Sequence, residues 1–268
     1  MAKLKPNFGL QGSAGNLSFY TRWDMEDVVI SRTKGGATKE KIKTSRKFKR
    51  TRELNAEFGG RAAASKWLMQ ACWPQKALAD YNIAGPVNTL IKPIQAMDTE
   101  SPHGKRNILL SGNPRLLEGF SFNRKTAFDS VIRNPVFYSV SRETLSAHVD
   151  IPALLPGINF YKPEKQPVCP MFSVIAVLGL VPDLFYSKLG YKSKDGYSLY
   201  TYAEATSAWY PMLKGSEAMS LDMQLDVIPP DPGFSLVLSI GIRFGTMLDA
   251  NTVQQVRRTG VAKVLATA

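Results

Sequence analysis

The pattern of hydrophobic and polar positions divides the chain into a helical first part and a strand-rich second part. From residue 105 onward, short stretches rich in β-branched and aromatic residues alternate with turn signals such as Pro156-Gly157 and Asp195-Gly196. Such stretches are typical of strands. We expect strands at 107–110, 119–123, 136–141, 145–151, 171–178, 197–203, 219–227 and 234–244. Short strands with regular turns indicate an antiparallel β-sandwich, which we expect over residues 105–268.

The clearest alternation lies in 219–227, where every second residue is apolar. This pattern predicts a strand with one buried face. Residues 234–242 also alternate, with Val237 as the one exception, and the five-residue turn Pro229–Gly233 between the two stretches predicts a hairpin. Residues 251–268 fit either a helix or a last strand, and the pattern leaves both open.

The first part begins with a glycine-punctuated segment, Gly9 to Gly15, which we interpret as a flexible or extended arm. A hairpin follows over 16–23 and 27–32. Thr38 then caps a helix that runs to Phe58 and ends at Gly59-Gly60. Further helices are expected at 62–72, 75–81 and 86–97, with a linker at 98–104. The sequence therefore predicts an α+β protein with a basic N-terminal arm, hairpin and helical region (1–104) and a sandwich domain (105–268).

Charge is concentrated near the N-terminus. The chain holds 34 Lys and Arg against 22 Asp and Glu, and residues 1–107 account for 19 and 9 of these, a net of +10. Between Lys39 and Arg52, only Glu40 opposes eight cations. On one continuous helix, four of the cations recur at i, i+4, i+7 and i+11 and would line one stripe. The candidate contact residues for a polyanion or a neighbouring subunit are Lys39, Lys43, Arg46, Lys47, Arg50 and Arg52.

The apolar residues of this expected helix do not gather on one face, so we expect the helix to need a partner. The charge favours an anionic surface, either nucleic acid or an acidic face of another protein. No zinc-finger spacing and no RNA-recognition aromatic pattern accompanies it, which argues against reading of specific bases.

Signatures of enzyme chemistry are missing from the sequence. No phosphate-binding loop, dinucleotide fingerprint, nucleophile elbow or zinc-protease helix is present. The two histidines, His103 and His148, have no local pattern of a catalytic triad, and Asp222 with Asp226 fits a solvated strand face. Cys72 and Cys169 are expected to be buried free thiols. We therefore predict a non-enzymatic protein with no catalytic residue, no metal site and no cofactor.

The N-terminus lacks the apolar run of a secretory signal. The most apolar window, 171–185, contains Pro182 and Asp183 and is too short to cross a bilayer. We expect a chain that is made in the cytoplasm without a signal peptide and is not inserted into a membrane.

The N-terminal layout resembles a protein family that is abundant in Bacteroidota genomes, with related openings in phage-like elements. The shared features are Gly15-Asn16-Leu17, a hairpin that ends in Ser31-Arg32, Thr38, and a basic helix that contains Arg46 and Arg52. The resemblance covers residues 9–58. The glutamine usual at that helix start is absent here, and Lys41 or Lys43 stands near its place. The family has no established activity, so the resemblance implies no catalytic residues and favours a structural or assembly component.

Together these features predict a self-assembling structural subunit of a filament, a shell or a virion-like particle. Its partners would be copies of itself, which the N-terminal arm and the basic helix contact. The alternative is a non-sequence-specific nucleic-acid-binding protein that uses the same basic helix. A third class, a carbohydrate- or ligand-binding sandwich, would expose Trp209 and Tyr210 at its site.

Overall fold

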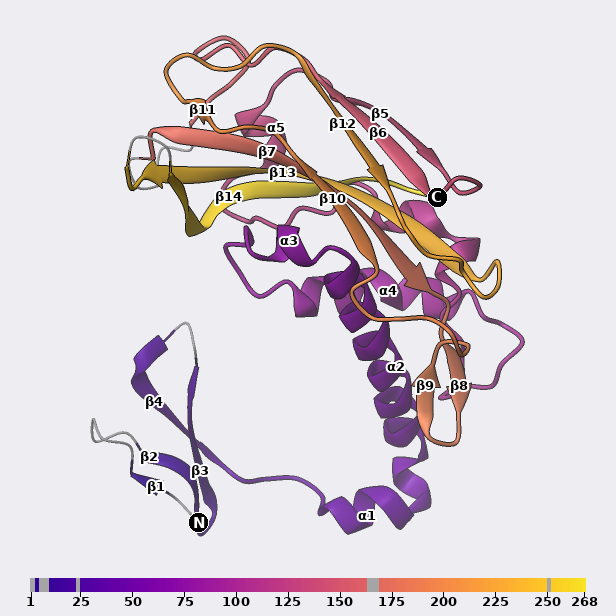
Figure 1. Ribbon diagram of the computed structural model, residues 1–268. Coiled ribbons are helices and arrows are strands. Elements are labelled where there is room, and N and C mark those ends of the chain that lie inside the picture. Colours follow the sequence, from indigo (N-terminus) through magenta and orange to yellow (C-terminus); the bar gives the residue numbers. More distant parts are fainter. Residues whose placement is uncertain (1–2, 5–9, 23–24, 163–168, 250–251) are drawn as a thin grey trace. The chain divides into compact units, whose positions relative to one another are not determined.

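Figure 1 shows the computed structural model of the chain, which describes residues 3–4, 10–22, 25–162, 169–249 and 252–268. The chain forms two compact units, Met1–Arg52 (the N-terminal unit) and Glu53–Ala268 (the C-terminal unit). This division differs from the boundary expected after residue 104. The reason is that the helices that follow Glu53 share a hydrophobic core with strands from the second half of the chain.

The C-terminal unit is built on one large antiparallel sheet. The strand order is β10-β7-β13-β14, and β11 also pairs with β7. The strands are β7 (Met171–Pro182), β10 (Tyr202–Thr206), β11 (Tyr210–Pro211), β13 (Phe234–Met247) and β14 (Val253–Thr267). Almost every residue of β7 and β13 is buried, so both faces of this sheet are covered.

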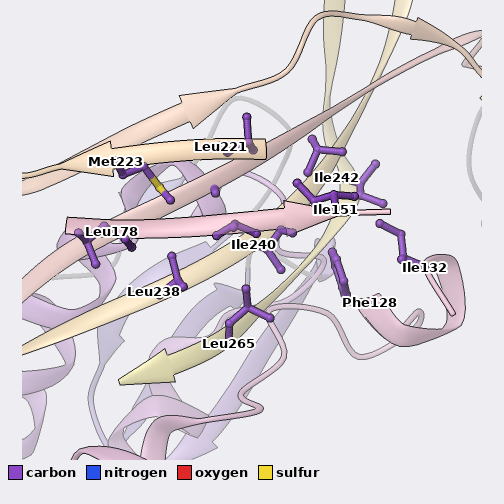
Figure 2. Close-up of a cluster of buried hydrophobic side chains, with 14 of the residues drawn as sticks. Phe128, Ile132, Ile151, Leu178, Leu221, Met223, Leu238, Ile240, Ile242 and Leu265 are labelled. Carbon is purple, nitrogen blue, oxygen red and sulfur yellow. The ribbon is translucent and has the colours of Figure 1, made fainter. Parts of the chain in front are cut away.

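Alternate residues of β7 enter two different cores, as the two-residue period of a strand requires. Val174, Ala176 and Leu178 belong to one cluster, and Ile175 and Val177 belong to the other. The first cluster lies between the large sheet and a three-stranded sheet of order β12-β6-β5. The strands of this smaller sheet are β5 (Phe137–Ser141), β6 (Ser146–Ile151) and β12 (Met219–Gln224). Figure 2 shows side chains of both sheets in this cluster, among them Ile151, Leu178, Leu221, Met223, Leu238 and Ile240.

Helices cover the other face of the large sheet, where the second cluster lies (Figure 1). They are α2 (Lys49–Ala71), α3 (Trp73–Lys76) and α4 (Ala84–Ala96). The approach is close at Gly179 of β7, where an added Cβ would lie 2.3 Å from the carbonyl oxygen of Ala71. The smaller elements are the 3-10 helices η2 (Leu110–Gly112) and η3 (Pro114–Leu117), helix α5 (Phe128–Val131), and the hairpin of β8 (Phe185–Ser187) and β9 (Gly190–Lys192).

The expected mixture of helices and antiparallel strands is confirmed, but a single sandwich is not, because the strands form several separate sheets. The expected hairpin of 219–227 and 234–244 is wrong, since β12 pairs with β6 and β13 pairs with β7 and β14. Residues 253–267, which fitted a helix or a strand, form β14. The stretches 107–110 and 119–123 make only isolated bridges, at Ile108 and Ser121.

The N-terminal unit contains a separate antiparallel sheet of order β1-β2-β3-β4. Its strands are β1 (Lys3–Leu4), β2 (Leu10–Ala14), β3 (Leu17–Arg22) and β4 (Met25–Thr33). The predicted hairpin is therefore present as β3 and β4. The expected arm from Gly9 to Gly15 is largely β2, while Gly9 lies outside the described residues. Gly15, at φ +52°, makes the two-residue turn to β3 possible, because glycine reaches this conformation without a steric penalty.

Candidate interaction surface

The basic segment, residues 38–52, is not one helix. Helix α1 (Lys39–Thr44) begins after Thr38, whose Oγ1 accepts a hydrogen bond from the backbone N–H of Lys41 at 3.3 Å. At Ser45 the backbone becomes extended (φ −69°, ψ 134°), and the 3-10 helix η1 (Arg46–Phe48) then leads into α2. The expected continuous helix from Thr38 to Phe58 is therefore wrong, because it is broken at Ser45.

Arg52 stabilises this break. Its Nη1 donates to the carbonyl oxygen of Ile42 at 2.7 Å and to that of Ser45 at 2.8 Å. Carbonyls near the end of a helix lack intrahelical partners, so a guanidinium is well suited to satisfy them. Arg52 is thus half-buried and holds the corner that the backbone makes at Ser45.

The expected helix end at Gly59-Gly60 is also wrong, since α2 continues to Ala71. A Cβ on Gly60 would lie 2.7 Å from the ring of Tyr191. Gly60 therefore lets an aromatic ring pack directly on the helix and does not act as a helix terminator.

The six predicted contact residues lie on both sides of the break. Two are in α1, two in η1 and two at the start of α2: Lys39, Lys43, Arg46, Lys47, Arg50 and Arg52. All except Arg52 are exposed. Because Ser45 interrupts the helix, they do not form the single straight stripe that helical spacing predicted. They form a bent cationic surface instead, with Arg52 as its internal support.

The sheet of the N-terminal unit has no buried side chain within the range where burial is described. None of residues 11–21 and 28–52 is buried. The cross-strand register places Leu17, Phe19 and Val29 on one face, and Tyr20 and Ile30 on the other. Both faces therefore carry apolar side chains, and neither encloses a core.

A buried ion pair organises the C-terminal unit near the start of α2. The carboxylate of Glu57 accepts from Nε and Nη2 of Arg106, both at 2.8 Å, and from the backbone N–H of Gly104 at 2.9 Å. These bonds, with that from Arg106 the strongest cause, hold the pKa of Glu57 at about 2 although burial opposes the charge. The carboxylate thus accepts three hydrogen bonds from the protein, which is typical of a structural ion pair.

A network of hydrogen-bonded polar side chains lies next to this ion pair. The Nη1 of Arg61 donates to Gln95 Oε1 at 2.9 Å, and Gln95 Nε2 donates to the hydroxyl of Tyr191 at 3.2 Å. Burial raises the pKa of Tyr191 to about 12, so its hydroxyl remains protonated at neutral pH. This network links α2, α4 and β9 and stabilises their packing.

The second cluster of titratable groups lies on the outer face of the three-stranded sheet. Nδ1 of His148 is 2.6 Å from Asp222 Oδ1, and Nε2 is 3.0 Å from Asp150 Oδ1. The Ser220 hydroxyl donates to Asp150 at 2.6 Å, so it is not activated by the imidazole. The hydrogen bonds to Asp222 and Asp150 raise the pKa of His148 above its ordinary value.

The alternation in the sequence places Asp222 on a solvated strand face but does not connect it with His148. The two residues are 74 positions apart. Only the register of β12 against β6 places them opposite each other. Alternation identifies the face of each strand, but no sequence signal identifies the pairing.

Trp209 and Tyr210, the candidate carbohydrate-stacking pair, are both engaged within the protein. The guanidinium of Arg243 lies 5.3 Å from the Trp209 ring centroid, and the Tyr210 ring is 5.7 Å from that of Phe172. Tyr210 also packs against the first core cluster. The pair does not form an open stacking platform.

Both cysteines are buried free thiols, as predicted. Cys72 is in the second cluster and Cys169 in the first, on opposite faces of the large sheet. Among the described residues, no group of three or more His, Cys, Asp or Glu side chains is placed to hold a metal ion. In the same part of the chain, every helix is too short or too polar to span a bilayer. Comparison with models of protein families, with curated proteins and with solved structures finds no match for this chain.

Proposed function

We propose that this chain is a non-enzymatic structural subunit that assembles with copies of itself through its N-terminal unit, as in a filament, a shell or a virion-like particle. The observation that carries the proposal is the contrast between the two units. The C-terminal unit has two hydrophobic cores, whereas the N-terminal unit has no buried side chain among residues 11–21 and 28–52.

A sheet without a core needs a partner to gain stability. Burial of a Val, Leu, Ile or Phe side chain contributes about 1.5–3 kcal/mol. Leu17 and Val28 are 43% and 51% exposed, so about half of this free energy is still to be gained. A second chain that covered one face of the sheet would supply it.

The edge of this sheet offers a further route to association. Strand β4 has nine residues, and among the described residues it pairs only with β3. Its other edge therefore presents backbone N–H and C=O groups that a strand from a neighbouring chain can pair with.

Binding of a polyanion is the second candidate, and the exposure of Lys39, Lys43, Arg46 and Lys47 favours it. Such cations would release counterions from a phosphate backbone on binding, and affinity would fall steeply with salt. The basic segment contains one aromatic residue, Phe48 of η1, which is partly buried, so contacts with the phosphate backbone would dominate and this candidate has no sequence preference.

Sedimentation velocity on the full chain separates the two candidates. Protein concentration is varied at low and high salt, with and without a random-sequence DNA duplex. For a self-assembling subunit, the sedimenting mass rises with protein concentration alone. A chain that remains monomeric at every concentration contradicts the proposal, and a rise that requires DNA supports the second candidate.

A surface variant tests the role of the N-terminal sheet directly. Val28→Asp places a charge on an exposed apolar position of β4 and is expected to raise the concentration needed for assembly. Leu189→Asp is the matched control, because Leu189 is 85% exposed in the turn between β8 and β9 of the C-terminal unit. Equal assembly of the two variants would exclude the apolar surface around Val28 as the contact.

A further inference from the structure

One surface of the C-terminal unit is acidic, although the whole chain has a net charge of +12. The sheet β12-β6-β5 and its flanks, residues 137–151 and 217–228, contain five acidic residues and one Arg, a net of −4. The acidic residues are Glu143, Asp150, Glu217, Asp222 and Asp226. The single cation, Arg142, is bound within the protein, since its Nη2 donates to the carbonyl of Pro232 and its guanidinium lies 4.4 Å from the ring centroid of Phe234.

The geometry of the sheet presents this charge outward. Alternate residues of β6 and β12 point into the first core, so Asp150 and Asp222 lie on the opposite face, with side chains 52% and 81% exposed. The edge strand β5 pairs only with β6 among the described residues. At this edge Phe137 is 65% exposed, and Ile228 beyond β12 is 92% exposed. Because Phe137 pairs with Asp150, the face combines negative charge with an exposed apolar side chain.

The opposite charge lies in the other unit of the chain. Residues 38–52 hold eight Lys and Arg against Glu40, a net of +7. The described residues of this segment are largely exposed, and none of them is buried. One chain therefore carries two surfaces of opposite sign, each on a separate compact unit.

We propose that the basic segment (38–52) of one copy docks on the outer face of the β12-β6-β5 sheet of the next copy. This inference rests on the proposed function and names one contact of the N-terminal unit, which is separate from its sheet. The two surfaces are different, so the contact is heterologous. Repetition of a heterologous contact produces a ring or a filament. Charge complementarity would favour this docking orientation and increase the rate of association.

His148 makes the contact dependent on pH. The charged groups that face its ring are Asp150 on its own strand and Asp222 on β12, while β5 contributes the uncharged Ser139 opposite it. When His148 is protonated, it cancels part of the negative charge of the face. A group whose pKa is raised gains its proton as pH falls through that raised value, so docking weakens as pH falls through the pKa of His148 and is strongest above it.

Charge-neutral variants of the full chain test the docking. Asp222→Asn with Asp226→Asn, and separately Lys43→Gln with Lys47→Gln, are each expected to raise the dissociation constant for self-association on the order of tenfold at moderate salt. The matched controls are Asp195→Asn, in an exposed turn after β9, and Lys66→Gln with Lys92→Gln, on exposed helix positions of the C-terminal unit. The controls are expected to assemble like the unmodified chain.

Mixing the two variants gives the most specific result. Each variant retains one of the two complementary surfaces, so an equimolar mixture can form one contact but cannot repeat it. At concentrations between the original and the raised dissociation constants, we expect a complex with the mass of two chains to predominate. If the mixture forms no complex, or if the Asp222/Asp226 variant assembles like Asp195→Asn, the proposed contact is wrong.

A second double variant of the acidic face controls for local unfolding around His148. Glu217→Gln with Asp226→Asn leaves the hydrogen bonds of His148 intact and is expected to weaken assembly as well. The pH dependence is checked between pH 5.5 and 8.5 with His148→Gln, for which assembly should no longer change, and with His103→Gln as control. Retained pH dependence in His148→Gln overturns the role of His148.

These outcomes are distinguishable from failure of the proposed function. A wild-type chain that never assembles contradicts the function itself. Assembly that is unaffected by the acidic-face variants contradicts only the docking site. Assembly that appears only with DNA contradicts both and favours the polyanion candidate.

Discussion

The ion pair of Glu57 and Arg106 gives the strongest prediction about stability. The Glu57 side chain is 1% exposed and Arg106 is 17% exposed. Glu57→Gln removes the charge that compensates a largely buried guanidinium but keeps the size of the side chain. Removal of one partner of a buried pair is costly because the other charge remains without compensation.

The pKa of Glu57 sets the size of the contribution of this ion pair to the free energy of unfolding and the way it depends on pH. The folded chain holds this pKa at about 2, against 4.5 for an unperturbed group. A tenfold change in an acid dissociation constant corresponds to about 1.4 kcal/mol, so the ionised carboxylate contributes about 3 kcal/mol at pH 7. Because the folded pKa is lowered, this contribution is present above pH 4.5 and is lost as pH falls toward 2. At pH 3 about 1 kcal/mol should remain.

Urea unfolding of the wild-type chain and of Glu57→Gln at pH 7, 5, 4 and 3 measures this difference in the free energy of unfolding. Glu100→Gln is the control, because Glu100 is an exposed carboxylate on the loop after α4. The difference between wild type and Glu57→Gln should shrink with falling pH, while Glu100→Gln remains close to wild type throughout. A difference that is the same at pH 7 and pH 3 would refute the electrostatic reasoning and would point to packing alone.

Three further predictions test other parts of the structure. Gly179→Ala forces a methyl group against a backbone carbonyl 2.3 Å away and should lower the melting temperature, with a cost of about 1–3 kcal/mol, whereas Gly85→Ala, whose added Cβ meets nothing within 4 Å, should leave the melting temperature equal or higher. Burial raises the pKa of the Cys72 thiol to about 12, so a thiol-specific reagent at pH 8 should not label it until denaturant is added; labelling of the native chain would contradict its burial. Arg52→Gln removes the donor to two backbone carbonyls, and hydrogen exchange of the amides around Ser45 should become faster; unchanged exchange would show that another group holds the corner.

Local patterns in the sequence were sufficient to predict many of the elements but not their partners. The alternation in 219–227 predicted β12 and its buried face, because that signal depends only on neighbouring residues. The partner of β12 is β6, about 70 residues away, and proximity in sequence wrongly suggested β13. Pairing between distant strands depends on how all the layers pack, which no local pattern contains.

The helices illustrate two errors of a different kind. Gly59-Gly60 has the form of a helix stop, yet α2 continues, and the ring of Tyr191 packs in the space that a side chain at Gly60 would need. Ser45 has no strong stop signal, yet the helix breaks there, and Arg52 satisfies the exposed carbonyls. In both cases a contact with a residue farther along the chain overrides the local preference.

The acidic face shows why counts along the sequence were an incomplete guide to the distribution of surface charge. Residues 108–268 have a net charge of only +2, with 15 Lys and Arg against 13 Asp and Glu, which suggests a nearly neutral half. Within that half, the segments 137–151 and 217–228 carry −4, so the remaining residues carry +6. Strand pairing brings these two acidic segments together on one sheet, while the excess cations lie elsewhere. The charge of a surface is therefore defined by register and face as much as by composition, and a chain whose sequence shows only a basic end can still carry an acidic surface.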